Sequence, residues 1–166
     1  MPKKNQDTIL ALDPGLRDLG YAVLRSRRIL ASGVRPLFLL PAERRITEAR
    51  RLVRSWIAAY RPGALILEAT YPHPVAGLDA VHRLAASVRT LARREGIAVA
   101  AYAPQSVRKT LTGHGWACKG EAAVAVSYRF PALRVYLTQD RKWKERYFPN
   151  MFDAVALALH HQAHAA

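Results

Sequence analysis

The chain has 166 residues and a single cysteine, Cys118, so it cannot form an internal disulfide bond. One cysteine is typical of proteins in a reducing cytosol. No apolar run approaches the ~18 residues of a membrane span, and no apolar core follows the lysines of the N-terminal MPKKNQDT. We therefore expect no membrane segment and no secretion signal. Internal repeats and low-complexity segments are also missing, which favours one domain over residues 1–166.

Acidic residues are scarce. The chain carries 12 Asp and Glu against 26 Lys and Arg, which gives a formal net charge of +14. Such an excess in a small domain is typical of proteins that bind polyanions, and nucleic acid is the obvious polyanion.

The most informative stretch is residues 8–24, TILALDPGLRDLGYAVL. Its apolar run 9–12 ends on Asp13, and a Pro-Gly turn then leads into an alternating apolar run. This pattern predicts a β-hairpin with a carboxylate at the tip of its first strand. A carboxylate placed there is costly unless it faces solvent or a cation, so Asp13 is a candidate metal ligand. The alternative is that Asp13 only begins an Asp-Pro-Gly turn.

The next elements predict an α/β fold. Residues 29–34 form a third strand, antiparallel to the second, and residues 42–60 carry the 3.6-residue periodicity of an amphipathic helix. The apolar run 64–67 then ends on Glu68, as the first strand ends on Asp13. Because a helix between two strands implies a parallel crossover, we expect both acids at the same edge of the sheet.

The second half predicts a helix over 78–92, a fifth strand over 97–102, and short helices from 104 to 131 around a Gly-His-Gly break, with Lys119 just beyond it. A loop is expected over 138–147. The last helix is expected to start near Asn150 and to carry Asp153 in its first turn, where its charge alone would favour the helix.

The acids Asp13, Glu68 and Asp153 stand out by position. Carboxylates gathered without a counter-charge repel one another, so a cluster of them is explained best by divalent cations. Magnesium held by carboxylates and bridged to phosphate can activate water and stabilise a leaving oxygen. A basic surface with an acidic pocket is the charge layout expected of a phosphodiesterase.

Four motifs in order along the chain resemble those of the RuvC family of Holliday-junction resolvases. The first is LDPGLRDLGYAV at 12–23, in which an Asp-Pro-Gly turn leads to a Gly-Tyr pair; the others are ALILE at 64–68, GHGWACK at 113–119, and DAVALAL at 153–159 with His161. The resemblance implies an RNase H-like fold: a five-stranded mixed sheet with three antiparallel strands first, then parallel strands, flanked by helices. It also implies Mg²⁺-dependent cleavage of four-way DNA junctions by a homodimer, with Mn²⁺ as a possible substitute.

The resemblance places Asp13, Glu68 and Asp153 on metal-binding carboxylate positions, and Lys119 on a basic catalytic position near the scissile phosphate. One position departs from the family pattern. Where the family commonly has a second acid or a histidine, three residues before the last aspartate, this chain has Asn150. A carboxamide oxygen can ligate Mg²⁺ but adds no negative charge.

The resemblance further implies DNA contacts and partners. Tyr71 falls where the family often has an aromatic that stacks near the junction centre, although it could equally cap the sheet edge. Arg108 or Lys109, with Lys119, falls near DNA-contacting basic positions, and the helix 78–92 corresponds to the dimer-forming region. A branch-migration motor is a possible partner, and a cytoplasmic, nucleoid-associated location follows from the substrate.

Two rival functions stay open at this point. One is a RuvC-like protein that binds junctions with weak or no cleavage. The other is an RNase H-like nuclease with a different substrate preference.

Overall fold

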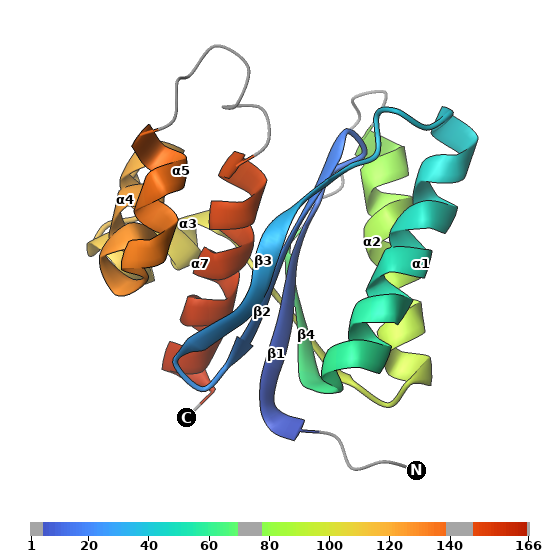
Figure 1. Cartoon of the computed structure of the whole chain (residues 1–166), viewed down its shortest axis with the longest axis horizontal. Helices are drawn as coiled ribbons and strands as arrows, with labels where there is room; N and C mark the ends of the chain where they lie inside the picture. Colours follow the sequence, from blue (N-terminus) through green and yellow to red (C-terminus); the bar gives the residue numbers. More distant parts are fainter. Residues whose placement is uncertain (1–4, 70–77, 139–147, 166) are drawn as a thin grey trace.

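A five-stranded mixed sheet lies between two layers of helices in the computed structural model, which describes residues 5–69, 78–138 and 148–165 (Figure 1). The strand order is β3-β2-β1-β4-β5; β1, β2 and β3 pair antiparallel, and β4 and β5 continue parallel to β1. The predicted fold is therefore confirmed. The strands are β1 (Asn5–Pro14), β2 (Asp18–Arg25), β3 (Arg28–Pro36), β4 (Pro62–Glu68) and β5 (Ala98–Tyr102).

Side-chain alternation along the two central strands divides the core into two layers. In β1, Leu10 and Leu12 join the cluster beneath the first two helices, whereas Ile9 and Ala11 join the cluster beneath the last helix. Asp13 continues this second series. The sequence of β1 thus fixes which layer of the protein its terminal carboxylate faces.

One face of the sheet is covered by α1 (Ala42–Tyr60) and α2 (Leu78–Arg94) (Figure 1). The bounds of α1 are those predicted, because its apolar stripe is regular: Ala49, Val53 and Ile57 are buried. The helix ends at Arg61, which has a left-handed φ of 49°, and Pro62 then opens β4.

The other face is covered by α7 (Phe148–His164), which begins two residues before the predicted start and includes Pro149 in its first turn, where proline is tolerated. The helix can lie close to the sheet because Gly20 has no side chain: a Cβ there would collide with the backbone of Asn150.

The remaining elements pack beside α7 (Figure 1); short helices are expected from 104 to 131, and the structure continues them to Thr138. They are α3 (Pro104–Thr112), α4 (Lys119–Arg129), the 3₁₀ turn η1 (Pro131–Leu133) and α5 (Arg134–Thr138). In the parts of the chain that the structure describes, no helix is long and apolar enough to cross a membrane. Tyr71 lies outside the described residues. The loop expected over 138–147 also lies outside them, except for Thr138, which is the last residue of α5.

Candidate metal-dependent active site

Two of the predicted carboxylates lie at one edge of the sheet, and the third lies on α7, the helix that covers this face. Leu12 pairs with Leu67 in the parallel β1–β4 ladder, so Asp13 and Glu68 follow at adjacent positions where both strands end. Strand alternation places both on the α7 face. Asp153 is on α7, five residues after the first helical residue Phe148. It therefore lies beyond the first turn, to which the favourable effect of a helix N-terminus on a negative charge is largely confined.

The charges of these acids are mutually unfavourable. Burial raises the pKa of Asp13 from 3.8 to about 7, with further contributions from the charges of Glu68 and Asp153, and the Lys119 ammonium offsets only part of this. The pKa of Glu68 is also raised, first by burial and then by Asp153, against the opposing charges of Lys119 and Arg108. The protein therefore holds these acids together at an electrostatic cost, as expected at functional sites.

Lys119 is the basic member of this cluster. It is the first residue of α4, and its Nζ lies 2.7 Å from Oδ2 of Asp153. Burial alone would lower the pKa of Lys119, but the hydrogen bond and charge of Asp153, together with the charges of Asp13 and Glu68, raise it. The start of α4 is fixed because the Cys118 N–H donates to the Glu121 carboxylate at 2.7 Å. Lys119 is therefore a charged lysine held against the acids.

The side chains of Asp13, Glu68 and Asp153 provide the oxygen ligands that a hard divalent cation prefers, but they do not form a three-ligand site as they stand. Among the described residues, no three His, Cys, Asp or Glu side chains lie close enough to share one ion as they stand. Asp153 is paired with Lys119 instead. Magnesium does not require a complete protein cage, since it keeps several waters and is usually held by one or two carboxylates plus substrate phosphate. Carboxylate oxygens are the donors that Mg²⁺ or Mn²⁺ prefers.

Asn150 serves the fold as well as being a candidate ligand. Its side-chain nitrogen donates to the Asp18 carbonyl oxygen at 3.1 Å and so ties the first turn of α7 to the start of β2. This bond uses the amide nitrogen, while a cation would use the amide oxygen. No local pattern predicts this hydrogen bond, because the two residues are far apart in the chain.

Arg108 and Lys109 are neighbours on α3 but face different places. Arg108 lines a narrow cleft together with Glu68 and Asp153. Lys109 lines a separate open pocket with His114 and Trp116. The structure thus separates two residues that the sequence offered as alternatives for one role.

Asp18 is a buried acid that the sequence analysis missed. Only 3% of the residue is exposed, and within the described residues its Oδ1 has no hydrogen-bond partner. Burial raises its pKa, while Arg17, whose Nε lies 3.4 Å from Oδ2, lowers it. Alternation along β2 was the available signal, since Asp18 and Gly20 share a face with the buried Ala22.

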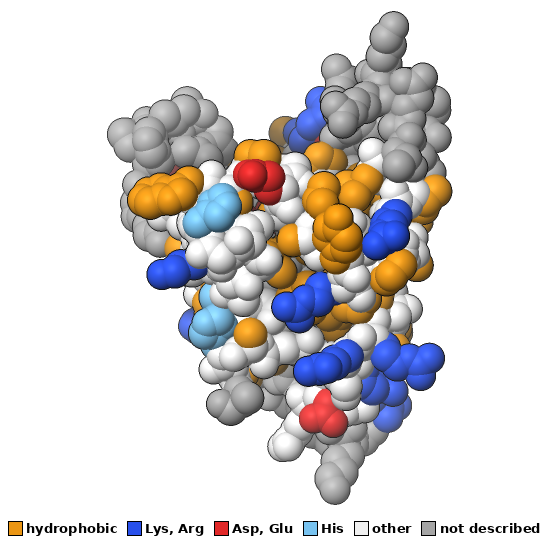
Figure 2. Space-filling model, turned by 90° about the vertical axis from the view of Figure 1, so that its left-hand side faces the viewer, with side chains coloured by type: hydrophobic (Ala, Val, Ile, Leu, Met, Phe, Trp, Pro, Cys, Tyr) orange, Lys and Arg blue, Asp and Glu red, His pale blue; other side chains and the backbone are white. Residues whose placement is uncertain are grey.

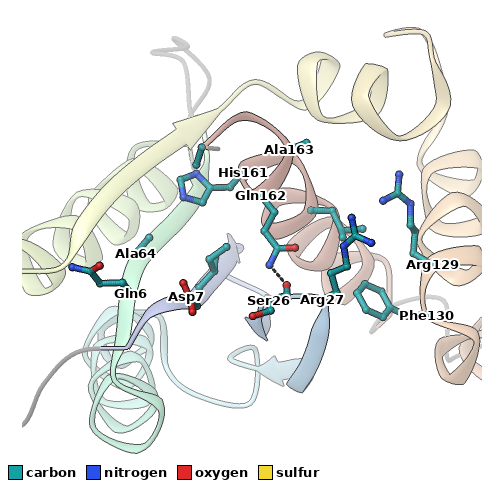
Figure 3. A pocket seen from close by; sticks show the side chains of 13 residues that line it. Gln6, Asp7, Ser26, Arg27, Ala64, Arg129, Phe130, His161, Gln162 and Ala163 are labelled. Atoms are coloured by element: carbon teal, nitrogen blue, oxygen red, sulfur yellow. Dashed lines mark hydrogen bonds between the residues drawn. The ribbon is translucent and has the colours of Figure 1, made fainter.

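A larger pocket of about 670 Å³ lies near the other end of the sheet, between the start of β1, the β2–β3 turn and the end of α7 (Figure 3). The Gln162 amide donates to the Ser26 carbonyl oxygen across its floor. Asp7 is the one acid among its described lining residues, beside Arg27 and Arg129. Size alone therefore does not mark the site, because this pocket gathers no carboxylate cluster.

The strand order and the helices on both faces define an RNase H-like fold. A family model described as crossover junction endodeoxyribonuclease RuvC matches residues 9–161. The chain belongs to the RuvC family, which confirms the resemblance seen in the motifs.

Relatives and solved structures agree with this assignment. A crossover junction endodeoxyribonuclease RuvC of Rhodopseudomonas palustris is 30% identical, over 98% of this chain and 91% of the relative, and one of a Bradyrhizobium strain is 31% identical, over 94% and 86%. The structure of Thermus thermophilus RuvC matches with a TM-score of 0.73 and 27% identity over 95% of each chain. T. thermophilus RuvC in complex with a Holliday junction substrate has the same fold, with a TM-score of 0.74 and 24% identity over 95% of this chain and 94% of that one.

Proposed function

We propose that the chain is a Mg²⁺-dependent endonuclease that resolves four-way DNA junctions by paired phosphodiester hydrolysis. One observation carries the proposal: acids from β1, β4 and α7 lie at one sheet edge of a basic protein, where the charge of Asp153 helps to raise the pKa values of Asp13 and Glu68. An acidic site on a chain of net charge +14 suits a nuclease, because the surface attracts the polyanion and the site needs cations to receive its phosphate.

Asp13 and Glu68 would hold the cation from the sheet, and Asp153 would join them from α7 through its carboxylate. Asn150 would add its amide oxygen. When bound, Mg²⁺ supplies polarisation of the phosphodiester and a more acidic water molecule.

Lys119 would stabilise the negative charge that develops on the phosphate. Its Nζ already lies beside the acids, so no large movement is needed to bring it to a phosphate bound there. Arg108 would contact DNA from the same cleft and Lys109 from the neighbouring pocket, and Tyr71 would stack near the junction centre.

Two protomers would act together. A two-fold dimer matches the pseudo-two-fold symmetry of a four-way junction and places one active site at each of two opposed strands. The helix 78–92, within α2, is the proposed dimer contact. A branch-migration motor is a further possible partner, and action on the chromosome implies a cytoplasmic location at the nucleoid.

The test uses a labelled four-way junction with Mg²⁺ and the wild type, Asp13→Asn and Asp7→Asn proteins. Asp7 is a matched control because it lies on the same strand but in the pocket at the other end. Symmetric nicks by the wild type and Asp7→Asn, with none by Asp13→Asn, support the proposal. Equal cutting by all three proteins removes Asp13 from the mechanism.

A second candidate is a protein that binds junctions and cuts slowly or not at all. The observation that favours it is Asn150, which adds no charge and is engaged with Asp18. Such a protein would bind junctions tightly and in a salt-dependent way, but would give no products with either Mg²⁺ or Mn²⁺.

A further inference from the structure

Trp116 is the most exposed large hydrophobic side chain in the described parts of the protein, at 92%. Trp56, by contrast, is buried and stacks on Tyr21 with ring centroids 4.2 Å apart. Single exposed hydrophobic residues are common and need no explanation by themselves. The surroundings of Trp116 account for its exposure, because the indole lines an open pocket.

The turn that carries Trp116 is held firmly. Gly113 ends α3 with a φ of 89°, and its N–H donates to the Lys109 carbonyl at 2.9 Å. The Thr112 hydroxyl donates to the Arg108 carbonyl at 2.9 Å and accepts the His114 N–H at 3.4 Å. At Gly115 a Cβ would lie 3.4 Å from the Gln105 carbonyl oxygen, so this part of the turn lies in van der Waals reach of α3. The indole is therefore presented on an ordered turn, which lowers the entropy lost when it binds a ligand.

Trp116 forms one wall of an open pocket of about 430 Å³ between α3 and this turn. That volume is within the ~300–1,000 Å³ range of small-molecule sites. The pocket offers an aromatic face, the amide of Gln105, the hydroxyl of Ser106 and the ammonium of Lys109, and no acid is among its described lining residues. Acidic side chains are also sparse on the side of the molecule where α4 and α5 lie (Figure 2). This combination suits a group with a flat ring, polar edges and a phosphate.

The pocket is linked to the acidic cluster by two short stretches of chain. Trp116 is three residues from Lys119, which limits their Cα separation to roughly 11 Å, and Lys119 contacts Asp153. Lys109 follows Arg108, which lines the cleft with Glu68 and Asp153. A DNA strand with a phosphate at the acids would therefore pass close to this pocket.

We propose that this pocket receives one unstacked nucleotide of the bound DNA, with its base against Trp116 and its phosphate beside Lys109; this rests on the proposed action on DNA. An aromatic side chain can stack only on a base whose face is free, and in an uninterrupted duplex the neighbouring base pairs cover both faces. The pocket thus favours branched or single-stranded DNA over plain duplex.

The test compares Trp116→Leu and Trp116→Phe in an Asp13→Asn background, so that DNA is bound but not cut. Tyr128→Leu is the control, because Tyr128 is a 71% exposed aromatic on α4 that does not line the pocket. Loss of stacking predicts junction binding by Trp116→Leu weaker by roughly 5- to 150-fold, with duplex binding unchanged. Trp116→Phe should retain most of the affinity and Tyr128→Leu all of it.

A fluorescent base analogue, 2-aminopurine, placed at successive positions around the cut site gives a second readout. One position should be quenched by the parent protein and not by Trp116→Leu. Unchanged junction affinity in Trp116→Leu, or equal losses for junction and duplex, would overturn the pocket proposal. Failure of the proposed function shows differently, as intact junction binding by the wild type without cutting.

Discussion

The two ends of β1 carry one acid each, and their surroundings differ. Asp7 is exposed and lines a large pocket that Arg27 and Arg129 also line. Asp13 is half-buried, next to Glu68 and Asp153, and its pKa is raised to about 7. The pocket at the Asp7 end is the larger, so the comparison shows that convergence of like charges, and not cavity volume, distinguishes the candidate active site.

Neutralising the acids at each end of β1 should have the largest effect on activity. Glu68→Gln and Asp153→Asn should each reduce the cleavage rate by roughly 10³-fold, because each removes a charge that a catalytic cation needs. Asp7→Asn should stay within about twofold of the wild type. Single-turnover cleavage of a labelled junction measures the cleavage rate of each variant. Similar losses at the two ends would mean that the acids act through general stability.

The two lysines near the acids should have different kinetic roles. Lys119→Met should lower kcat by roughly 10²-fold with little change in KM, because its Nζ lies within the acidic cluster. Lys109→Met should mainly raise KM, since Lys109 lines the neighbouring pocket. Steady-state kinetics on one junction substrate distinguishes the effect on kcat from the effect on KM. Equal effects of both substitutions on kcat would contradict the division between cleft and pocket.

The pH dependence should come from Asp13. A metal ligand must be deprotonated, and the pKa of Asp13 in the metal-free protein is about 7. The Mg²⁺ concentration for half-maximal cutting should therefore rise by up to about tenfold per pH unit below 7 and level off above it. Titrations of Mg²⁺ at several pH values measure this concentration. A half-maximal Mg²⁺ concentration that stays constant from about pH 5.5 to about pH 8.5 would exclude Asp13 as the titrating ligand.

Stability should respond in the opposite sense to activity. With a pKa of about 7 in the folded state against an ordinary value of 3.8, Asp13 binds more protons when folded, so its contribution to stability falls as pH rises from about 4 to 7. Metal-free Asp13→Asn should thus be more stable than the wild type by roughly 1 to 3 kcal/mol at about pH 8, and equally stable near pH 4. Urea denaturation with a chelator measures the difference, and destabilisation at pH 8 would contradict it.

Much of this site followed from local patterns. The apolar run of β1 ends on Asp13 and that of β4 ends on Glu68, and the helix between them required parallel strands, so their meeting at one edge could be predicted. The regular stripe of α1 likewise gave its bounds.

Other features depend on packing between distant segments and left no local signal. The Lys119–Asp153 ion pair joins two helices, and the bond from Asn150 to Asp18 joins α7 to β2. Which of Arg108 and Lys109 lines the cleft with the acids depends on how α3 packs against α7. The start of α7 was placed too late because Pro149 lies inside its first turn.

Direct binding of Mn²⁺ tests the central claim, that the acids at the ends of β1 and β4 hold a divalent cation together with Asp153. Calorimetric titration of Mn²⁺ in the presence of uncut DNA should show a site in the wild type and in Asp7→Asn that is lost or greatly weakened in both Asp13→Asn and Glu68→Gln. Undiminished Mn²⁺ binding by those two variants would contradict it.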